Sequence, residues 1–161
     1  MKNLLAIGLI GGLLYLGSRV LGAKRLGDRS VVRTLNARIA KVTLQGITLA
    51  ADIFIDNPTN TGVRVSKPVV TVSTAGKYLA SSVPSRDVYT IAALSQTSLG
   101  TTEIEISWST LSPFISSVLS QWRSLIGKQN LNLQSLNIPL EYSYSLYVND
   151  LFYQSDPQPL A

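Results

Sequence analysis

The chain has 161 residues, a formal net charge of +5, 45% hydrophobic residues and only 14% charged residues. It contains no cysteine and no histidine. The first absence excludes disulfides, zinc–thiolate sites and thiol nucleophiles, and the second removes the most frequent general base and metal ligand. An enzyme of this composition would depend on carboxylates or lysine. We therefore expect a protein that is not an enzyme and has no cofactor.

The positive charge is concentrated near the N-terminus. Residues 1–41 hold eight Lys and Arg against one Asp, a net charge of +7, whereas residues 42–161 hold six basic and eight acidic residues, a net charge of −2. A nucleic-acid-binding domain usually carries a basic surface of its own, so this partition argues against a nucleic-acid partner.

The uncharged stretch Asn3 to Ser18 predicts a single transmembrane helix. Sixteen residues of α-helix extend about 24 Å, and residues 19–23 can lengthen the helix toward the roughly 30 Å hydrocarbon core. A cleaved signal peptide is an alternative, but Arg19 interrupts the tail of the apolar region. A buried core helix is another, but no polar face is present. We expect an uncleaved anchor with its basic flank over residues 1–33, whose lipid-facing side chains are Leu4, Leu5, Ile7, Leu9, Ile10, Leu13, Leu14 and Leu16.

Residues within and after this stretch indicate how the anchor would sit in a bilayer. Gly8 and Gly12 have the spacing that allows close contact between membrane helices, although glycine is also common in such helices in general. One lysine precedes the stretch, and a basic cluster follows it. The positive-inside rule then places the globular domain of this single-pass protein on the cytoplasmic side, and a signal-anchor interpretation reverses that orientation. The side chains expected at anionic lipid headgroups are Arg19, Lys24, Arg25 and Arg29.

From residue 34 to residue 161 the sequence predicts one mainly β domain. Alternating apolar residues indicate strands, with either a bulge near Ile39-Ala40 or two short strands there. Pro68 interrupts the strand that contains it, so we expect an edge position or a bend at that residue. Asn149-Asp150 predicts a short hairpin turn. The tail from Asp156 is expected to be an extended end without a role in the core. The expected strands are 34–44, 47–56, 63–73, 88–92, 97–108 (with Trp108 facing inward) and 139–148.

One amphipathic helix interrupts the strand pattern. Ser112 has the character of an N-cap, Pro113 suits the first helical position, and Gly127 ends the helix. Apolar residues recur between them with a period of 3.6 and serines fill the opposite side. We expect this helix to cover an open end or face of a sandwich, and a partner-binding surface is the alternative.

The best candidate acid–base pair is Glu103 with Glu105. These residues lie two apart on the outward face of a strand, where nothing distinguishes an acid from a base. Asp52 and Asp56 also fall on an outward face. We interpret all four carboxylates as solvated, and not as an active site or a metal site.

Three motifs in order resemble the late embryogenesis abundant type 2 family, also called water-stress-and-hypersensitive-response domains. They are Ile53-Phe54-Ile55-Asp56-Asn57-Pro58, then Gly76-Lys77-Tyr78-Leu79-Ala80, then the Thr-rich strand from Thr97 to Ile106, and together they fit the family pattern over residues 35–107. The resemblance implies a two-sheet antiparallel β-sandwich of fibronectin-III-like shape with one helix, and no catalytic residues. Asn57 and Pro58 are the turn motif of that family, where an Asn side chain caps its own turn and Pro ends the strand.

The leading functional hypothesis is a membrane-anchored structural protein whose β-sandwich binds a protein partner at the bilayer surface. The partner would be another protein, a second copy or a capsid. Two alternatives remain. One is a virion membrane protein of a membrane-containing bacteriophage that bridges lipid and capsid. The other is a binding module for lipid or another apolar ligand, held between the sheets and the helix in a cavity that Phe114, Trp122 and the tyrosines would line.

Overall fold

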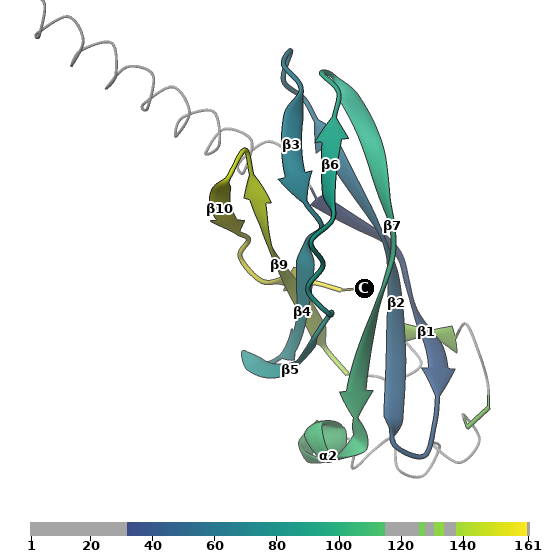
Figure 1. The fold of residues 1–161 in the computed structure, drawn as a ribbon. Coiled ribbons are helices and arrows are strands. Elements are labelled where there is room, and N and C mark those ends of the chain that lie inside the picture. The colour runs from purple at the N-terminus through teal and green to yellow at the C-terminus, as the bar shows by residue number, and fades with distance from the viewer. Residues whose placement is uncertain (1–31, 115–125, 128–130, 134–137, 161) are drawn as a thin grey trace, which may run out of the picture.

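The computed structural model describes residues 32–114, 126–127, 131–133 and 138–160. This part of the chain is mainly β, with two antiparallel sheets that pack as two layers and one short helix (Figure 1). Of the predicted anchor and basic flank, 1–33, residues 1–31 lie outside the described residues, and Val32 and Arg33 begin the first strand. Most of the predicted helix, 115–125, also lies outside the described residues. Within the described part, no helix has the length and apolarity needed to cross a membrane.

The first sheet has the strand order β7-β2-β1-β8. Its strands are β1 (Val32–Val42), β2 (Gly46–Asn57), β7 (Ser95–Ser107) and β8 (Leu131–Asn132). Ile39 lies opposite Leu49 and Lys41 opposite Thr48, so Ala40 is an extra residue on β1. This confirms the predicted bulge, since one unpaired residue reverses which side chains face inward.

The second sheet is built around β9. Its strands are β3 (Val63–Ser66), β4 (Val69–Thr74), β5 (Lys77–Ser81), β6 (Val88–Ile91), β9 (Leu140–Val148), β10 (Leu151–Gln154) and β11 (Gln158–Pro159). β3 and β4 pair with one side of β9, and β10 and β11 with the other. β6 pairs with β3, and β5 pairs with β4. The sheet therefore has four rows of strands, and in three of these rows two shorter strands lie end to end.

The predicted break at Pro68 is present, but it lies in an interior row and not at a sheet edge. Val65 pairs with Val148 and Val69 with Ser145, so the β3–β4 side holds one residue more than β9. Pro68 is buried at this bulge, where the missing N–H of proline costs no ladder bond. The neighbouring Lys67 amide donates outside the ladder, to the carbonyl of Asp87 at 2.9 Å.

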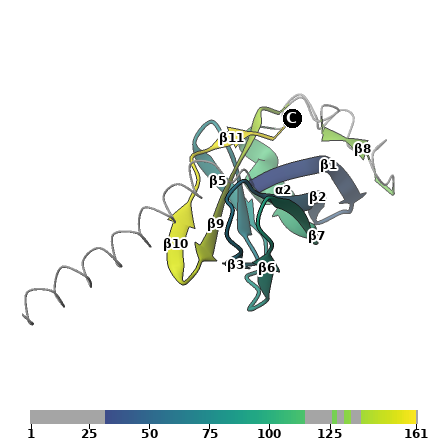
Figure 2. The same ribbon diagram turned by 90° about the horizontal axis from the view of Figure 1, so that it is seen from above.

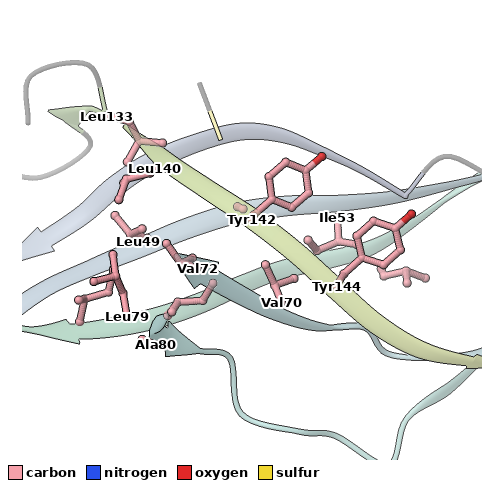
Figure 3. Packing of buried hydrophobic residues seen from close by; sticks show 14 of the residues in the cluster. Leu49, Ile53, Val70, Val72, Leu79, Ala80, Leu133, Leu140, Tyr142 and Tyr144 are labelled. Atoms are coloured by element: carbon pink, nitrogen blue, oxygen red, sulfur yellow. The ribbon is translucent and has the colours of Figure 1, made fainter. Parts of the chain in front are cut away.

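Alternate side chains of both sheets form one apolar core, as Figure 3 shows. The first sheet contributes Leu49 and Ile53, and the second contributes Val72, Tyr142 and Tyr144. All are residues that the alternation pattern directs inward. Full burial of an aliphatic side chain of this size contributes about 1.5–3 kcal/mol, so the two inner faces provide the main stabilisation.

A short helix lies directly before the segment that the sequence predicts to be helical, most of which is outside the described residues. Helix α2 spans Trp108–Leu111, and the hydroxyl of its N-cap Ser107 accepts a hydrogen bond from the Thr110 amide at 3.3 Å. Ser112 is the C-cap of α2 and opens a 3-10 turn, η1 (Ser112–Phe114), so the predicted N-cap is wrong. Trp108 is helical and not a strand residue. Its indole Nε1 donates to the Thr43 carbonyl at 2.8 Å, which ties α2 to the β1–β2 turn.

The prediction for the C-terminal tail is also wrong. Strand β11 pairs with β9, and the Tyr142 hydroxyl donates to Gln158 Oε1 at 3.0 Å. Leu160 packs against the core, and the buried Ser155 hydroxyl accepts from the Tyr144 amide at 2.9 Å. The tail therefore pairs with the edge of β9 that faces away from β3 and β4. β10 pairs with only part of that edge.

One polar atom in the core gives a test of this packing. The Thr102 hydroxyl is buried on the inner face of β7 and has no hydrogen-bond partner among the described residues. Thr102→Val removes an unpaired hydroxyl at nearly constant shape, so we expect it to raise the free energy of unfolding by about 1 kcal/mol. The measurement is thermal unfolding of the full chain in mild detergent.

The neighbouring Thr101 provides the matched control. Its hydroxyl lies on the exposed face and donates to Asp52 Oδ1 at 2.7 Å. Thr101→Val should be neutral or lower the stability by up to about 1 kcal/mol. If Thr102→Val lowered the stability, that result would contradict the finding that the Thr102 hydroxyl has no hydrogen-bond partner in the described part of the chain.

Candidate functional site

Several chain segments meet at one end of the sandwich. β1 begins there at Val32, opposite Ile55, and β2 ends there at Asn57. Two connections cross between the sheets at this end, residues 58–62 and residues 92–94. We call it the Asn57 end. Any segment that precedes residue 32 joins the described domain at this end.

The Asn57 side chain is buried and links the two crossing connections. Its Nδ2 donates to the Thr61 carbonyl and to the Ala92 carbonyl, each at 2.9 Å. Its Oδ1 accepts from the amide of Thr59 at 3.1 Å and from the Thr59 hydroxyl at 2.6 Å. The predicted capping of its own turn is confirmed. The bond to Ala92 joins residues that are 35 apart in the sequence, so no local sequence pattern predicts it.

This arrangement requires an amide side chain. An aspartate would keep the acceptor for Thr59 but would place a carboxylate against two carbonyl oxygens, and an alanine would leave those carbonyls unpaired. Pro58 is exposed and follows directly after the last residue of β2. The turn motif that the sequence singled out is therefore a structural element, and it offers no group for chemistry.

The outward carboxylates of β7 lie beside a shallow hollow at the other end of the first sheet. Glu103, Glu105 and Lys41 are exposed and line an open depression of about 700 Å³ together with the β1–β2 turn. The two carboxylates stand on one strand face with solvent around them, which matches the prediction. The lining also includes the hydroxyl-bearing residues Thr43, Thr48 and Ser107, and the Ser107 hydroxyl is hydrogen-bonded to those of Ser109 and Thr110. Within the described residues, no three acidic side chains approach closely enough to hold a metal ion.

The residues predicted for the membrane lie outside the described part of the chain. They are the anchor residues Leu4, Leu5, Ile7, Leu9, Ile10, Leu13, Leu14 and Leu16, the glycines Gly8 and Gly12, and the headgroup residues Arg19, Lys24, Arg25 and Arg29. Of the predicted site residues, Asn57 and Pro58 of the turn motif lie in the described part of the chain, and they are neighbours in the sequence. The anchor predictions stay predictions.

Sequence reasoning missed a group of exposed apolar residues near the Asn57 end. Val88, Tyr147 and Phe152 lie on the outer face of the second sheet, and Leu94 lies in the connection between β6 and β7. Each falls at an outward or loop position where a polar residue is the common choice. The alternation of the sequence already indicated that these side chains face outward. Their proximity to one another depends on strand pairing, since β6, β3, β9 and β10 lie side by side in that order (Figure 2).

Comparison with known proteins does not identify a family. No family model matches the chain, and no curated protein matches it. Among solved structures, a protein from Archaeoglobus fulgidus is similar with a TM-score of 0.47 and 14% sequence identity, over 80% of this chain and 94% of that one. A likeness at this level identifies neither a fold nor an activity.

The Asn57 network predicts a large effect from one side chain. We expect Asn57→Ala to lower the free energy of unfolding by about 1–3 kcal/mol, since it removes the bonds of a buried amide to the part-buried carbonyls of Thr61 and Ala92 and to the Thr59 donors. Asn57→Asp should cost a similar amount because it keeps only the Thr59 half of the network. Thermal unfolding of the full chain in detergent measures both.

Asn60 is the matched control, since it is exposed in the same connection. Asn60→Ala should change the stability by less than about 0.5 kcal/mol. Equal effects at the two positions would show that the buried amide does not hold the crossing connections together.

Proposed function

We propose that this chain is a non-enzymatic, membrane-anchored scaffold protein that presents a β-sandwich at the cytoplasmic surface of a bilayer. We also propose kinship with the late embryogenesis abundant type 2 family. Its partners are the lipid bilayer and a second protein, and the sandwich supplies shape and surface for that contact. The single observation that carries the proposal is the uncharged stretch Asn3 to Ser18, followed by a cluster of basic residues.

The way the described domain begins supports a tether. Val32 opens a strand that pairs with β2 from Val32↔Ile55 to Val42↔Ile47. The hydrogen bonds of such a ladder run perpendicular to the strands. A pull on Val32 along β1 therefore loads many bonds together, which suits a domain held at a surface by its first strand.

The described surface supports a role without chemistry. The exposed carboxylates of β7 share their open hollow with Lys41 and with Ser107, whose hydroxyl caps α2, and the chain has no histidine or cysteine. The apolar-ligand alternative drew on the tyrosines as cavity lining. Tyr142 and Tyr144 are instead members of the packed core between the sheets, which favours a scaffold over a carrier.

The order of structural elements supports the proposed kinship. The Asn57 turn links two strands of different sheets, and Ala75-Gly76 forms a tight hairpin between β4 and β5, with φ of +48° and +73°. These are the positions at which the family resemblance expects a turn and a hairpin. The two-sheet arrangement agrees with the sandwich that the resemblance implies.

A virion protein is the alternative that a cytoplasmic orientation favours, because a domain on that side would face the shell of a particle assembled inside the cell. Partners that co-purify with the detergent-solubilised full chain distinguish the two cases. Capsid protein would favour the virion function, and other proteins the cellular scaffold.

Extraction of membranes with alkaline carbonate tests the tether. We expect the full chain to stay in the pellet, and Leu9→Lys combined with Leu13→Lys to move it to the supernatant. Each charge at the centre of a membrane helix costs about 2.5–3.5 kcal/mol on insertion scales, so two should abolish stable insertion. Leu44→Lys, at an exposed site of the domain, is the control and should not change the pellet. Release of the unsubstituted chain, or a mature chain that begins beyond Ala23, would contradict the tether.

The orientation has its own test, since the chain contains no native cysteine. Leu44→Cys places a single thiol on the exposed β1–β2 turn. A membrane-impermeant maleimide added to spheroplasts of a bacterial host should label this thiol only after the membrane is permeabilised. Labelling of intact spheroplasts would reverse the orientation and favour a signal anchor.

A further inference from the structure

An apolar surface with no described partner lies beside the Asn57 end. Phe152 is directly opposite Tyr147, and their rings meet edge to face with centroids 5.5 Å apart. Tyr147 is level with Ser66, which pairs with Val88. Val88, Tyr147 and Phe152 therefore lie on one line across the sheet, with Ser66 of β3 between Val88 and Tyr147, and they are 54%, 53% and 60% exposed.

Leu94 lies nearer the tip of the domain, beyond the exposed Arg64 and Thr90 of the outer face. It is 73% exposed and has a φ of +50°, a left-handed conformation that bulky side chains rarely adopt. Its amide donates to the Thr59 carbonyl at 2.9 Å, in the connection that the Asn57 side chain fixes. The network thus holds a large apolar side chain outward in a turn with a left-handed backbone conformation.

We propose that Val88, Leu94, Tyr147 and Phe152, which we call the corner patch, lie on the bilayer surface at the level where headgroups meet acyl chains. This inference rests on the proposed function, because it takes the membrane to be the one that holds the anchor. It adds a second contact with lipid, made by the folded domain itself.

Chain length makes this contact geometrically available. Eight residues, 24–31, separate the extended apolar segment from β1, and a fully extended chain spans at most about 3.3–3.6 Å per residue, or about 29 Å. β1 begins at the Asn57 end, which is the end that carries the corner patch. The tether therefore limits this end to within about 29 Å of the lipid, a range that includes direct contact.

The chemistry of the corner patch suits the membrane interface. Tyrosine and other aromatic side chains concentrate at the headgroup level, where a ring can sit in apolar surroundings with a polar tip in water. The exposed ions at its border are Arg64 and Arg86 against Asp87 and Asp150, so their charges cancel. The patch contributes apolar contact, and attraction to anionic lipid comes from the basic flank.

A second copy of this chain or another protein could cover the same residues, and a probe that reports lipid directly separates these cases. Thr90→Cys and Gln154→Cys place single thiols at exposed sites next to the corner patch and leave its four residues intact. Leu44→Cys is the distant control. Each full-length variant is labelled with an environment-sensitive fluorophore and reconstituted into vesicles of phosphatidylcholine and phosphatidylglycerol, with or without brominated acyl chains. Flotation of the vesicles reports whether the chain is anchored.

We expect the probes at positions 90 and 154 to shift to the blue and to lose emission in brominated vesicles, and the probe at 44 to do neither. Tyr147→Ser with Phe152→Ser should abolish the quenching while the chain still floats and unfolds cooperatively. Chains that float with no quenching at 90 and 154 would overturn the corner patch and leave the anchor standing. A blue shift that brominated lipid does not quench and that grows with protein density would overturn it in favour of a second copy. Failure to float would overturn the anchor itself.

Discussion

The buried amide of Asn57 is the constraint on which this architecture depends. A two-sheet sandwich needs connections that cross from one layer to the other, and such connections carry backbone groups that no sheet ladder satisfies. One side chain satisfies groups from two of these crossings, at Thr59 and Thr61 and again at Ala92. It thereby fixes how the two layers meet at one end, which side-chain packing alone does not determine.

Fixing that end has consequences for what the molecule presents to its surroundings. The same end receives the chain at Val32, and the same crossings hold Leu94 away from the core. At the opposite end, Trp108 ties the short helix to the β1–β2 turn through the Thr43 carbonyl. The domain is thus closed by polar links at both ends and filled by aliphatic and tyrosine side chains between them.

Much of this fold could be predicted from the sequence because strand alternation is a local signal. The phase change at Ala40, the break at Pro68 and the turn at Asn149 were readable from neighbouring residues alone. The position of the short helix α2 was not predictable in this way, because Ser107 and Ser112 can both act as helix caps. The cap at Ser107 is accompanied by the hydrogen bond from the Trp108 indole to the Thr43 carbonyl, which joins distant parts of the sequence. The sequence also did not predict three other features: the pairing of the tail with β9, the Asn57–Ala92 link and the corner patch. Each depends on which strands become neighbours, and no local pattern encodes that.

The central claim is that one apolar segment is embedded in lipid and that a sandwich fixed by Asn57 is attached to it at one end. Hydrogen–deuterium exchange of the full chain in lipid nanodiscs, read by mass spectrometry, tests both parts in one experiment. The account predicts that amides of residues 3–18 exchange as slowly as those of β2, and that the loop amides of Thr59 and Leu94 are protected with them. Rapid exchange throughout residues 3–18 in lipid would contradict the account.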